Sequence, residues 1–321
     1  MLLSLPRLLT PYYRVCFLAA AVESGLLRRL ADGPATLEQL ADERVGDAGL
    51  RDGLEAWLDL GSALGLLRRG PAGYALRGRL PRALAEADRD AAAALFEEAG
   101  TLDHRWIMEA PARLREGRPF SPADVPGELI ARSSRIVEPF VREAVEDAVT
   151  ARGPVRLLEI GCGSGVHIRH AADRNPELTA LGLDLEPAAV ALARAHMDAS
   201  GLATRVRIEE GDVRHQTPTA DFDIATLHNN IYYFPVADRV RLLSHVRGFL
   251  RPGGRLVVTS SCRGGSPTTE ILNVRGALTA GCGRLPGREE LVEQLRAAGF
   301  SAVRSRRLIP GERVYAFVAR N

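Results

Sequence analysis

The second half of the chain alternates short apolar runs with stretches of helical periodicity. The first five runs are VRLLEI (155–160), TALGLDL (179–185), RVRIEEG (205–211), FDIATLH (222–228) and GRLVVTS (254–260). Strands that alternate with helices in this way predict a doubly wound parallel sheet. Two later runs, 300–309 and 312–320, are joined by a Pro-Gly pair, which predicts a hairpin that adds an antiparallel strand to the sheet.

The first 80 residues have the pattern of short helices followed by a hairpin. Residues 16–33 are periodic as one helix that ends near Gly33, and Thr36 with Gln39 three positions later has the spacing of a capping box. A further helix is predicted from an apolar stripe made of Leu50, Leu54, Trp57, Leu58 and Leu60. The segment 66–76 then predicts two short strands around a Pro-Ala-Gly turn. Three helices followed by such a wing have the outline of a winged-helix domain.

A helical middle section separates these two parts. Residues 82–150 have helical periodicity throughout, except at 116–128, where Pro119, Pro122 and Pro126 forbid a continuous helix. The sequence therefore predicts three sections: a winged-helix-like domain at 1–85, a helical linker at 86–150 and an α/β domain at 151–321. The 321 residues are enough for about two domains.

Composition narrows the chemistry. The net charge of +2 gives no reason to expect nucleic acid or an anionic membrane as a partner. All 42 basic residues are arginine, which excludes a phosphate-binding lysine and a Schiff base.

The four cysteines form no CxxC pair, so we expect neither a zinc site nor a disulfide framework, and a reducing cytoplasm is the simplest setting. Pro6, Arg7 and Arg14 interrupt the apolar start of the chain, which argues against a signal peptide, and no apolar run is long enough for a membrane span.

The stretch LLEIGCGSGVH (157–167) is the first candidate site, because three glycines follow an apolar strand. Gly161, Gly163 and Gly165 allow positive φ and let a ligand approach the backbone. The dinucleotide fingerprint requires a sixth-position glycine, where this chain has Val166. The turn alone is compatible with a phosphate cradle, a cradle for another cofactor, or a simple connection between a strand and a helix.

Acidic residues after the next strands favour a nucleoside that carries positive charge. Asp184 ends the second strand, 23 residues after Gly161, where a carboxylate can accept hydrogen bonds from both ribose hydroxyls. Asp212 follows the third strand and can accept from an adenine amine, while Leu185 and Val213 can sandwich the ring. Glu159 brings a further negative charge close to the glycines. Three carboxylates without a lysine suit a cation better than a pyrophosphate.

These motifs, in this order, resemble those of the class I S-adenosylmethionine (SAM)-dependent methyltransferases. LLEIGCGSG resembles the first motif of that family, LGLDLEP its ribose-binding acid, EEGDV its adenine-contacting motif and LRPGGRLVV its approach to the fifth strand. The resemblance implies a Rossmann-like seven-stranded sheet with one antiparallel strand, and SAM as cofactor. The cofactor-binding residues that it implies are Glu159, Gly161, Gly163, Gly165, Asp184, Leu185, Asp212, Val213 and Leu227.

Together, the winged-helix outline and the Leu-His pair after the fourth strand resemble the small-molecule O-methyltransferases. In that family the N-terminal domain mediates dimerisation, so the resemblance implies a homodimer. It also implies that His228 is the general base. The family usually continues His-Asp-Trp, whereas this chain reads HNNIYYF (228–234).

Further residues are candidates for binding the acceptor. Asn229 and Asn230 can hydrogen-bond an acceptor oxygen or ligate a hard metal, while Tyr232 and Tyr233 either line the pocket or pack as an aromatic pair. In the resembled family the helical middle section roofs the acceptor pocket. This chain carries there His104, Trp106 and Met108.

The preferred reading is a cytoplasmic, dimeric enzyme that methylates a small molecule, a hydroxyl oxygen of a secondary metabolite first of all. A metal-assisted C-methyltransferase acting on an α-keto acid or ketide is an alternative, but its relatives need a second histidine where residues 277–287 offer only Cys282, so no metal is expected. His167 and His170 lie one helical turn apart, and we expect them on a surface face. A SAM-sensing DNA-binding regulator is disfavoured, because residues 47–60 carry four acids against Arg51 alone.

Overall fold

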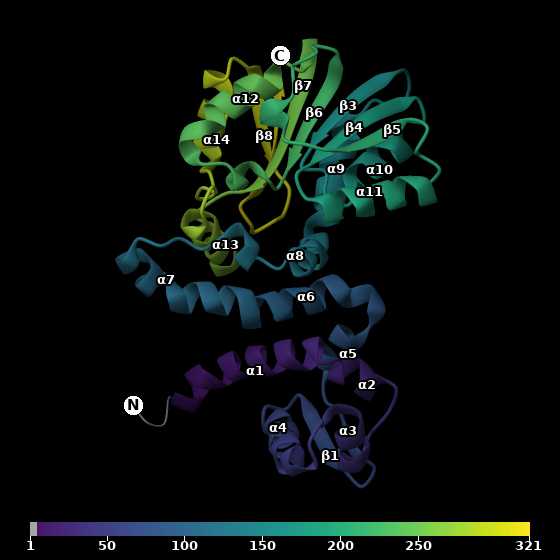
Figure 1. Cartoon of the computed structure of the whole chain (residues 1–321), viewed down its shortest axis with the longest axis vertical. Coiled ribbons are helices and arrows are strands. Elements are labelled where there is room, and N and C mark those ends of the chain that lie inside the picture. Colours follow the sequence, from purple (N-terminus) through teal and green to yellow (C-terminus); the bar gives the residue numbers. More distant parts are fainter. Residues whose placement is uncertain (1–4) are drawn as a thin grey trace. The chain divides into compact units, whose positions relative to one another are not determined.

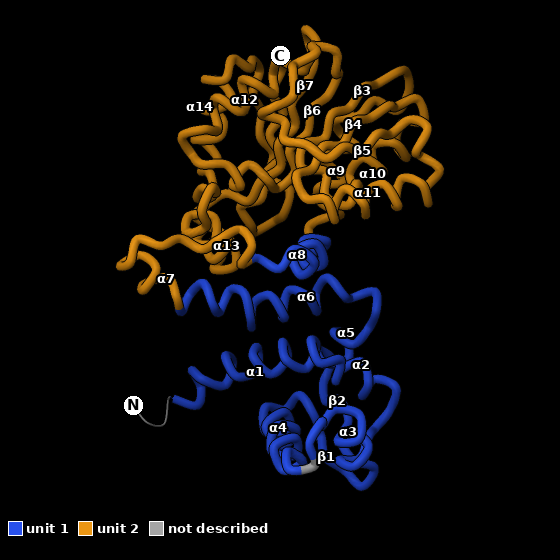
Figure 2. Tube along the Cα trace, viewed as in Figure 1, with its two compact units in different colours: residues 1–108, 125–136 blue, residues 109–124, 137–321 orange. Residues whose placement is uncertain are grey.

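The computed structural model describes residues 5–321 and divides into two compact units. Unit 1 comprises Met1–Met108 and Val125–Ile136, of which residues 1–4, the start of the apolar N-terminal stretch, lie outside the described part (Figure 2). Unit 2 comprises Glu109–Asp124 and Val137–Asn321. The helical section expected at 86–150 is therefore shared between the two units.

Unit 1 is built of helices with one small hairpin. Its elements are α1 (Leu5–Glu23), α2 (Leu26–Ala31), α3 (Leu37–Arg44), α4 (Arg51–Ala63), β1 (Leu67–Gly70), β2 (Gly73–Leu76), α5 (Arg79–Ala85), α6 (Asp90–Glu98) and α8 (Gly127–Ser133). A π-helical turn, Ala99–Asp103, leads from α6 into α7 (His104–Glu116), which crosses the boundary between the units. The capping box at Thr36 and the hairpin are confirmed. The single helix predicted for 16–33 is wrong, because Gly25 adopts a left-handed φ of 72° and separates α1 from α2.

The hairpin is fixed to α4 by polar contacts. The Arg69 guanidinium forms an ion pair with Glu55 at 2.7 Å, and the Tyr74 hydroxyl donates a hydrogen bond to Asp59 at 2.8 Å. Burial and the neighbouring Asp59 carboxylate raise the pKa of Tyr74 to about 12. The apolar stripe predicted for this helix is only partly correct, because Leu58 is buried while Leu50 and Leu60 are exposed. Two of the acids of α4 thus bind the wing.

Unit 2 contains the predicted seven-stranded sheet. Its strands are β3 (Val155–Ile160), β4 (Leu178–Asp184), β5 (Val206–Glu210), β6 (Phe222–His228), β7 (Leu250–Ser261), β8 (Ser301–Arg307) and β9 (Val314–Arg320). They lie in the order β5-β4-β3-β6-β7-β9-β8. β9 is the strand that runs opposite to the other six, since it pairs antiparallel with both β7 and β8, as the C-terminal hairpin predicts. The strand order reverses between β3 and β6, and the carboxyl ends of these strands define the crevice where ligands of such sheets bind.

Helices cover both faces of this sheet. On one face lie α9 (Glu138–Ala148), α10 (Val166–Arg174) and α11 (Pro187–Ala199); on the other lie α12 (Arg239–Arg247) and α14 (Arg288–Ala297) (Figure 1). A further helix, α13 (Pro267–Leu278), follows β7. The two apolar layers form separate clusters, with Val141 and Ile168 in one and Leu243 and Phe317 in the other. Within residues 5–321, no helix is both long and apolar enough to cross a membrane.

Gly182 of β4 lets α10 pack closely against the sheet. A Cβ at this position would lie 2.8 Å from the Cδ1 atoms of Ile168 and Ile208 and 3.0 Å from the Cys162 Sγ. We predict that Gly182→Ala lowers the free energy of unfolding by about 1–3 kcal/mol through overpacking. Gly53→Ala is the matched control, because this exposed position in α4 has open space around it and alanine is expected to raise stability by about 0.5–1 kcal/mol. Denaturation of both variants in urea measures the difference, and equal stabilities would contradict the packing argument.

Candidate cofactor site

The glycine turn leaves β3 at Ile160 and enters α10 at Val166. Gly161 and Gly163 have left-handed φ angles of 67° and 53°. A Cβ at Gly161 would lie 2.5 Å from the Asn230 Nδ2, whereas a Cβ at Gly163 would have no heavy atom within 4 Å. The turn is therefore closed by Asn230 on one side and open at Gly163, where a ligand can approach the backbone.

Asp184 lies beside this turn at the end of β4, as predicted. Its Oδ2 accepts a hydrogen bond from the Gly163 amide at 2.8 Å, and its Oδ1 accepts one from the Glu186 amide at 3.0 Å. The next residue, Leu185, is exposed and offers an apolar surface. The structure thus brings together an open turn, a carboxylate and an apolar side chain.

Asp212 follows β5, and its carboxylate is already engaged. It accepts hydrogen bonds from the Arg214 amide at 2.9 Å and from the Arg214 Nη2 at 2.6 Å. The Arg214 guanidinium holds the pKa of Asp212 below its usual range. Val213 is buried in the apolar cluster beneath α12, and its part in an adenine sandwich stays a prediction. The sequence reading missed Arg214, although it stands only two positions from Asp212.

Glu159 is an acid buried beside the turn without a partner. The residue is 1% exposed, and within residues 5–321 neither carboxylate oxygen has a hydrogen-bond partner. Burial raises the pKa of Glu159 well above its usual value, and Asp184 acts in the same direction. The nearby Ile168 amide opposes both, although its geometry falls short of a hydrogen bond. The adjacent Thr226, its neighbour in the sheet, also has an unpartnered hydroxyl. Since buried polar groups are normally paired, these atoms fit a ligand that brings a cationic amine.

His228 ends β6 on the same face of the sheet as Glu159 and Thr226. The residue is 7% exposed, and its Nδ1 lies 3.1 Å from the Thr259 Oγ1 of β7. The Nε2 has no partner among the residues that the structure describes. Burial lowers the pKa of His228 well below its usual value, and His167 acts in the same direction, so the imidazole is neutral near pH 7.

The prediction that His167 and His170 lie on a surface face is wrong. His170 is buried and its Nε2 lies 3.0 Å from the Glu138 Oε1, on α9. The ring of His167 packs edge-on against His228, with centroids 4.7 Å apart. Burial lowers the pKa of His167 to about 4. The partners of these histidines come from α9 and β6, too far along the chain to be read from local spacing.

The segment after β6 folds over the glycine turn. Asn229 adopts a left-handed φ of 52°, and the Asn230 side chain donates a hydrogen bond to the Ile160 carbonyl. Tyr232 is buried, whereas Tyr233 is 50% exposed, with ring centroids 5.0 Å apart. Leu227 lies in the apolar cluster on the opposite face of β6, and its place among the cofactor-binding residues stays a prediction.

The remaining acceptor candidates belong to unit 1. Trp106 is buried, Met108 is exposed and the His104 ring lies 6.0 Å from that of Tyr12. Their part in binding an acceptor stays a prediction, because they lie on α7 outside unit 2.

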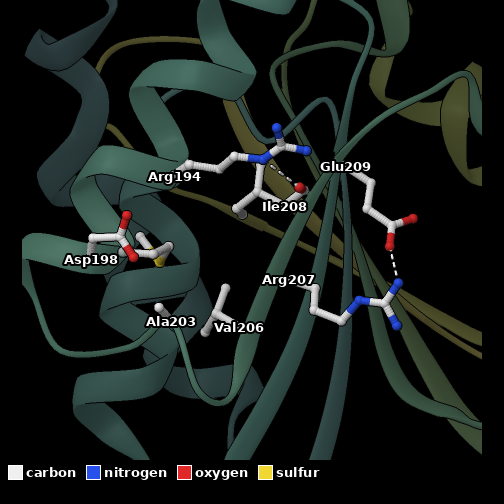
Figure 3. Close-up of a pocket in the computed structure, with 8 residues that line it drawn as sticks. Arg194, Asp198, Ala203, Val206, Arg207, Ile208 and Glu209 are labelled. Carbon is white, nitrogen blue, oxygen red and sulfur yellow. Dashed lines mark hydrogen bonds and ion pairs between the residues drawn. The ribbon is translucent and has the colours of Figure 1, made fainter.

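Two other features bear on ligand binding. Across residues 5–321, no group of three or more histidine, cysteine or acidic side chains is arranged to hold a metal ion. A hollow of about 370 Å³ lies between α11 and the edge strand β5 (Figure 3). It is lined by Arg194, Met197, Asp198, Ala203, Val206, Arg207, Ile208 and Glu209. None of these residues belongs to the candidate site.

The fold and the site together define a class I SAM-dependent methyltransferase. When β3 is counted as the first strand, the strand order of the sheet is 3-2-1-4-5-7-6. An open glycine turn follows this first strand, and an acidic residue lies at or after the end of each of the next two strands. Residues 157–254 match the methyltransferase domain family. The N,N-dimethyltransferase OxyT of Streptomyces rimosus is 30% identical over 95% of this chain and 92% of its own. The acetylserotonin O-methyltransferase of Mus musculus is 32% identical over 79% of this chain and 73% of its own. The chain therefore belongs to the SAM-dependent methyltransferases, and its cofactor is SAM.

A solved structure agrees with this assignment at the level of the fold. The mitomycin 7-O-methyltransferase MmcR matches with a TM-score of 0.82 and 20% identity, over 99% of this chain and 97% of that one. The predicted seven-stranded fold with an N-terminal helical region is thus confirmed.

Two substitutions test the cofactor site. We predict that Asp184→Ala weakens SAM binding by about 100-fold or more, because charged hydrogen bonds contribute about 1.5–3 kcal/mol each. Gly163→Val should do the same, since valine is strained at a φ of 53° and fills the open side of the turn. Titration calorimetry measures the affinity, with the exposed Asp198→Ala of α11 as the control. Near-normal affinity in both variants would contradict the site.

Acid pH should destabilise the protein through His167. Its pKa of about 4 lies below the usual 6.5, so below pH 6.5 the unfolded chain takes up a proton that the folded protein does not. The contribution of the neutral His167 to the free energy of unfolding is therefore present above pH 6.5 and is lost as the pH falls towards 4. The loss is about 2 kcal/mol at pH 5. His167→Gln should flatten the stability profile between pH 7 and 5 by this amount in urea denaturation.

The raised pKa of Glu159 changes the free energy of unfolding with pH in the opposite direction. The effect of His167 is therefore measured as the difference between the stability profiles of the parent protein and the variant. The exposed His215→Gln is the control. An unchanged slope in His167→Gln would show that this imidazole does not stay neutral in the folded protein.

Proposed function

We propose that the protein transfers the methyl group of SAM to a hydroxyl oxygen of a small molecule, a secondary metabolite. The single observation that carries the cofactor half of this proposal is the buried, unpartnered carboxylate of Glu159 beside the open glycine turn. Glu159 would pair with the cofactor's amine, Gly163 would present its backbone, and Asp184 would accept from the ribose hydroxyls. When bound, SAM supplies an electrophilic methyl group on a sulfonium.

The proton of the acceptor requires a base, and we propose His228. Its neutral imidazole lies at the carboxyl end of β6. If the Thr259 hydroxyl accepts from Nδ1–H, the lone pair lies on the unpartnered Nε2. A base that is oriented by a third group in this way is typical of sites that activate a nucleophile. With SAM as methyl donor, the Nε2 of His228 would take up the proton that the acceptor hydroxyl loses when it becomes methylated.

An amine nitrogen is the second candidate acceptor. The Nε2 of His228 is buried, which makes it less accessible to an acceptor's proton. A neutral amine already has a free lone pair and needs no base to become nucleophilic. The likeness to an N,N-dimethyltransferase over 95% of the chain also favours nitrogen. The two candidates differ in whether His228 is required for turnover.

We further propose a homodimer located in the cytoplasm. A cluster of large apolar side chains on α1 is exposed and is suited to pairing with a second copy: Leu5, Leu8, Leu9, Tyr12 and Tyr13. The four cysteines are unpaired, which suits a reducing compartment.

The function is tested by incubating the protein with methyl-labelled SAM and a panel of phenols, aliphatic alcohols, primary and secondary amines, and α-keto acids. We expect label in a hydroxyl or amine acceptor, and NMR of the product identifies the methylated atom. Absence of transfer to every member, together with absence of SAM binding, would refute the proposal. Label on the carbon of an α-keto acid would overturn the choice of a heteroatom.

His228→Asn separates the two heteroatoms. With a hydroxyl acceptor we predict that turnover falls by about 100-fold or more while SAM affinity is unchanged, as expected when a general base is lost. Because the pKa of His228 is lowered, kcat/KM of the parent enzyme should be level from pH 6.5 upwards and fall only in acid. The exposed His215→Asn is the control. Full turnover in His228→Asn would remove His228 from the reaction and favour an amine acceptor.

A further inference from the structure

Arg239, the first residue of α12, is an arginine that solvent does not reach. It is 0% exposed and lies three positions after the segment 229–236, which we call the acceptor loop. Its Nε donates a hydrogen bond to the Phe234 carbonyl at 3.2 Å, and its Nη2 donates one to the Arg284 carbonyl at 2.6 Å. One guanidinium therefore joins the acceptor loop to a second segment that is 45 residues further along the chain.

This second segment, residues 279–287 between α13 and α14, also contacts the acceptor loop directly. The Gly283 amide donates a hydrogen bond to the Tyr232 carbonyl at 2.9 Å. A Cβ at Gly283 would lie 2.7 Å from the Arg239 Nη2 and 2.8 Å from the Phe234 carbonyl oxygen. The two segments thus meet at a position where only glycine fits.

The segment 279–287 is itself anchored to three other parts of unit 2. The Ala280 amide donates to the Phe120 carbonyl at 2.8 Å, and the Leu285 amide donates to the Asn273 side chain of α13 at 2.9 Å. The Arg284 guanidinium binds the Glu290 carboxylate of α14 with two hydrogen bonds of 2.8 and 2.9 Å. Arg239 therefore ties the acceptor loop to a fixed support.

A buried charge is costly for stability, which makes the choice of arginine informative. No carboxylate among the described residues forms an ion pair with Arg239; two carbonyls accept from Nε and Nη2, Nη1 has no partner there, and the Glu290 carboxylate favours the charged form. Burial lowers the pKa of Arg239 to about 10, so the group is still charged at neutral pH. An apolar side chain of similar length would fill the same space at a lower desolvation cost. The arginine donors, rather than its bulk, account for its presence.

We propose that Arg239 is a positioning residue: through the Phe234 and Arg284 carbonyls it holds the acceptor loop in the shape that lets an acceptor meet the methyl group. This inference rests on the proposed function, because it assigns residues 229–236 to acceptor binding. The hydrogen bonds of Arg239 itself go to carbonyls outside the glycine turn, whereas the acceptor loop reaches that turn through the hydrogen bond from Asn230 to the Ile160 carbonyl.

Arg239→Met tests the inference, because methionine keeps much of the volume and removes the donors. With the acceptor that gives turnover in the panel, we expect KM for the acceptor to rise about 10-fold or more. The SAM dissociation constant from calorimetry should stay within about 2-fold of the parent value. Arg241→Met is the matched control, since Arg241 lies on the same helix with its side chain 82% exposed.

Gly283→Ala provides a second variant in which the arginine is intact. The added Cβ disturbs the same contacts, so acceptor KM should rise as in Arg239→Met, and the double variant should be affected by less than the product of the single effects. If Arg239→Met fails to fold, Gly283→Ala still tests the contact. A parent-like acceptor KM in a folded Arg239→Met or Gly283→Ala would overturn the inference, as would an equal loss of SAM affinity.

Hydrogen exchange gives a readout that does not depend on the acceptor. In Arg239→Met, amides of 229–236 and 279–285 should exchange at least about 10-fold faster, while those of the glycine turn keep their rates and Arg241→Met matches the parent. Unchanged exchange in both segments would overturn the inference. Failure of the parent protein to bind SAM or to transfer a methyl group would instead refute the proposed function. Hydrogen exchange therefore tests the role of Arg239 separately from the proposed function.

Discussion

The hydrogen bond from the Gly163 amide to the Asp184 carboxylate is the contact on which the site depends. It joins the turn after β3 to the end of β4, so two strand ends and a helix start are held in one arrangement. The contact requires the left-handed backbone at Gly163, and it leaves the outer side of the turn open. A ligand that approaches this turn therefore meets a backbone whose position is already fixed, and little order has to be created on binding.

Below this turn the protein tolerates a layer of unsatisfied polar atoms. The carboxylate of Glu159, the hydroxyl of Thr226 and one nitrogen each of His167 and His228 lack partners among the described residues. Leaving such groups unpaired in the interior is costly, and natural proteins do so rarely. The imidazoles reduce the cost by staying neutral, and Glu159 does so by a raised pKa. A layer of this kind is suited to binding a polar ligand, whose groups can pair with these atoms.

Much of the fold and of the cofactor side of this site was predictable from sequence. Apolar runs bounded by turn residues mark strands wherever a sheet is covered on both faces, and the seven strands were found in this way. Asp184 and the glycines are candidates for the site because their positions relative to strand ends are set by local geometry. The roles of Leu227 and Val213 are harder to predict, because adjacent residues of a strand point to opposite faces and the neighbouring sequence does not reveal which face carries the ligand.

Residues whose roles come from distant partners could not be predicted. His167 and His170 were placed on the surface because Glu138 and His228 approach them only after the sheet has formed. Arg239 showed no signal, since its acceptors are backbone carbonyls, which every residue carries. The cofactor side is built from backbone conformation and strand-end acids, whereas the acceptor side is built from side chains and loops that meet across the fold. The identity of the cofactor can therefore be read from motifs, while that of the acceptor depends on contacts that motifs do not encode.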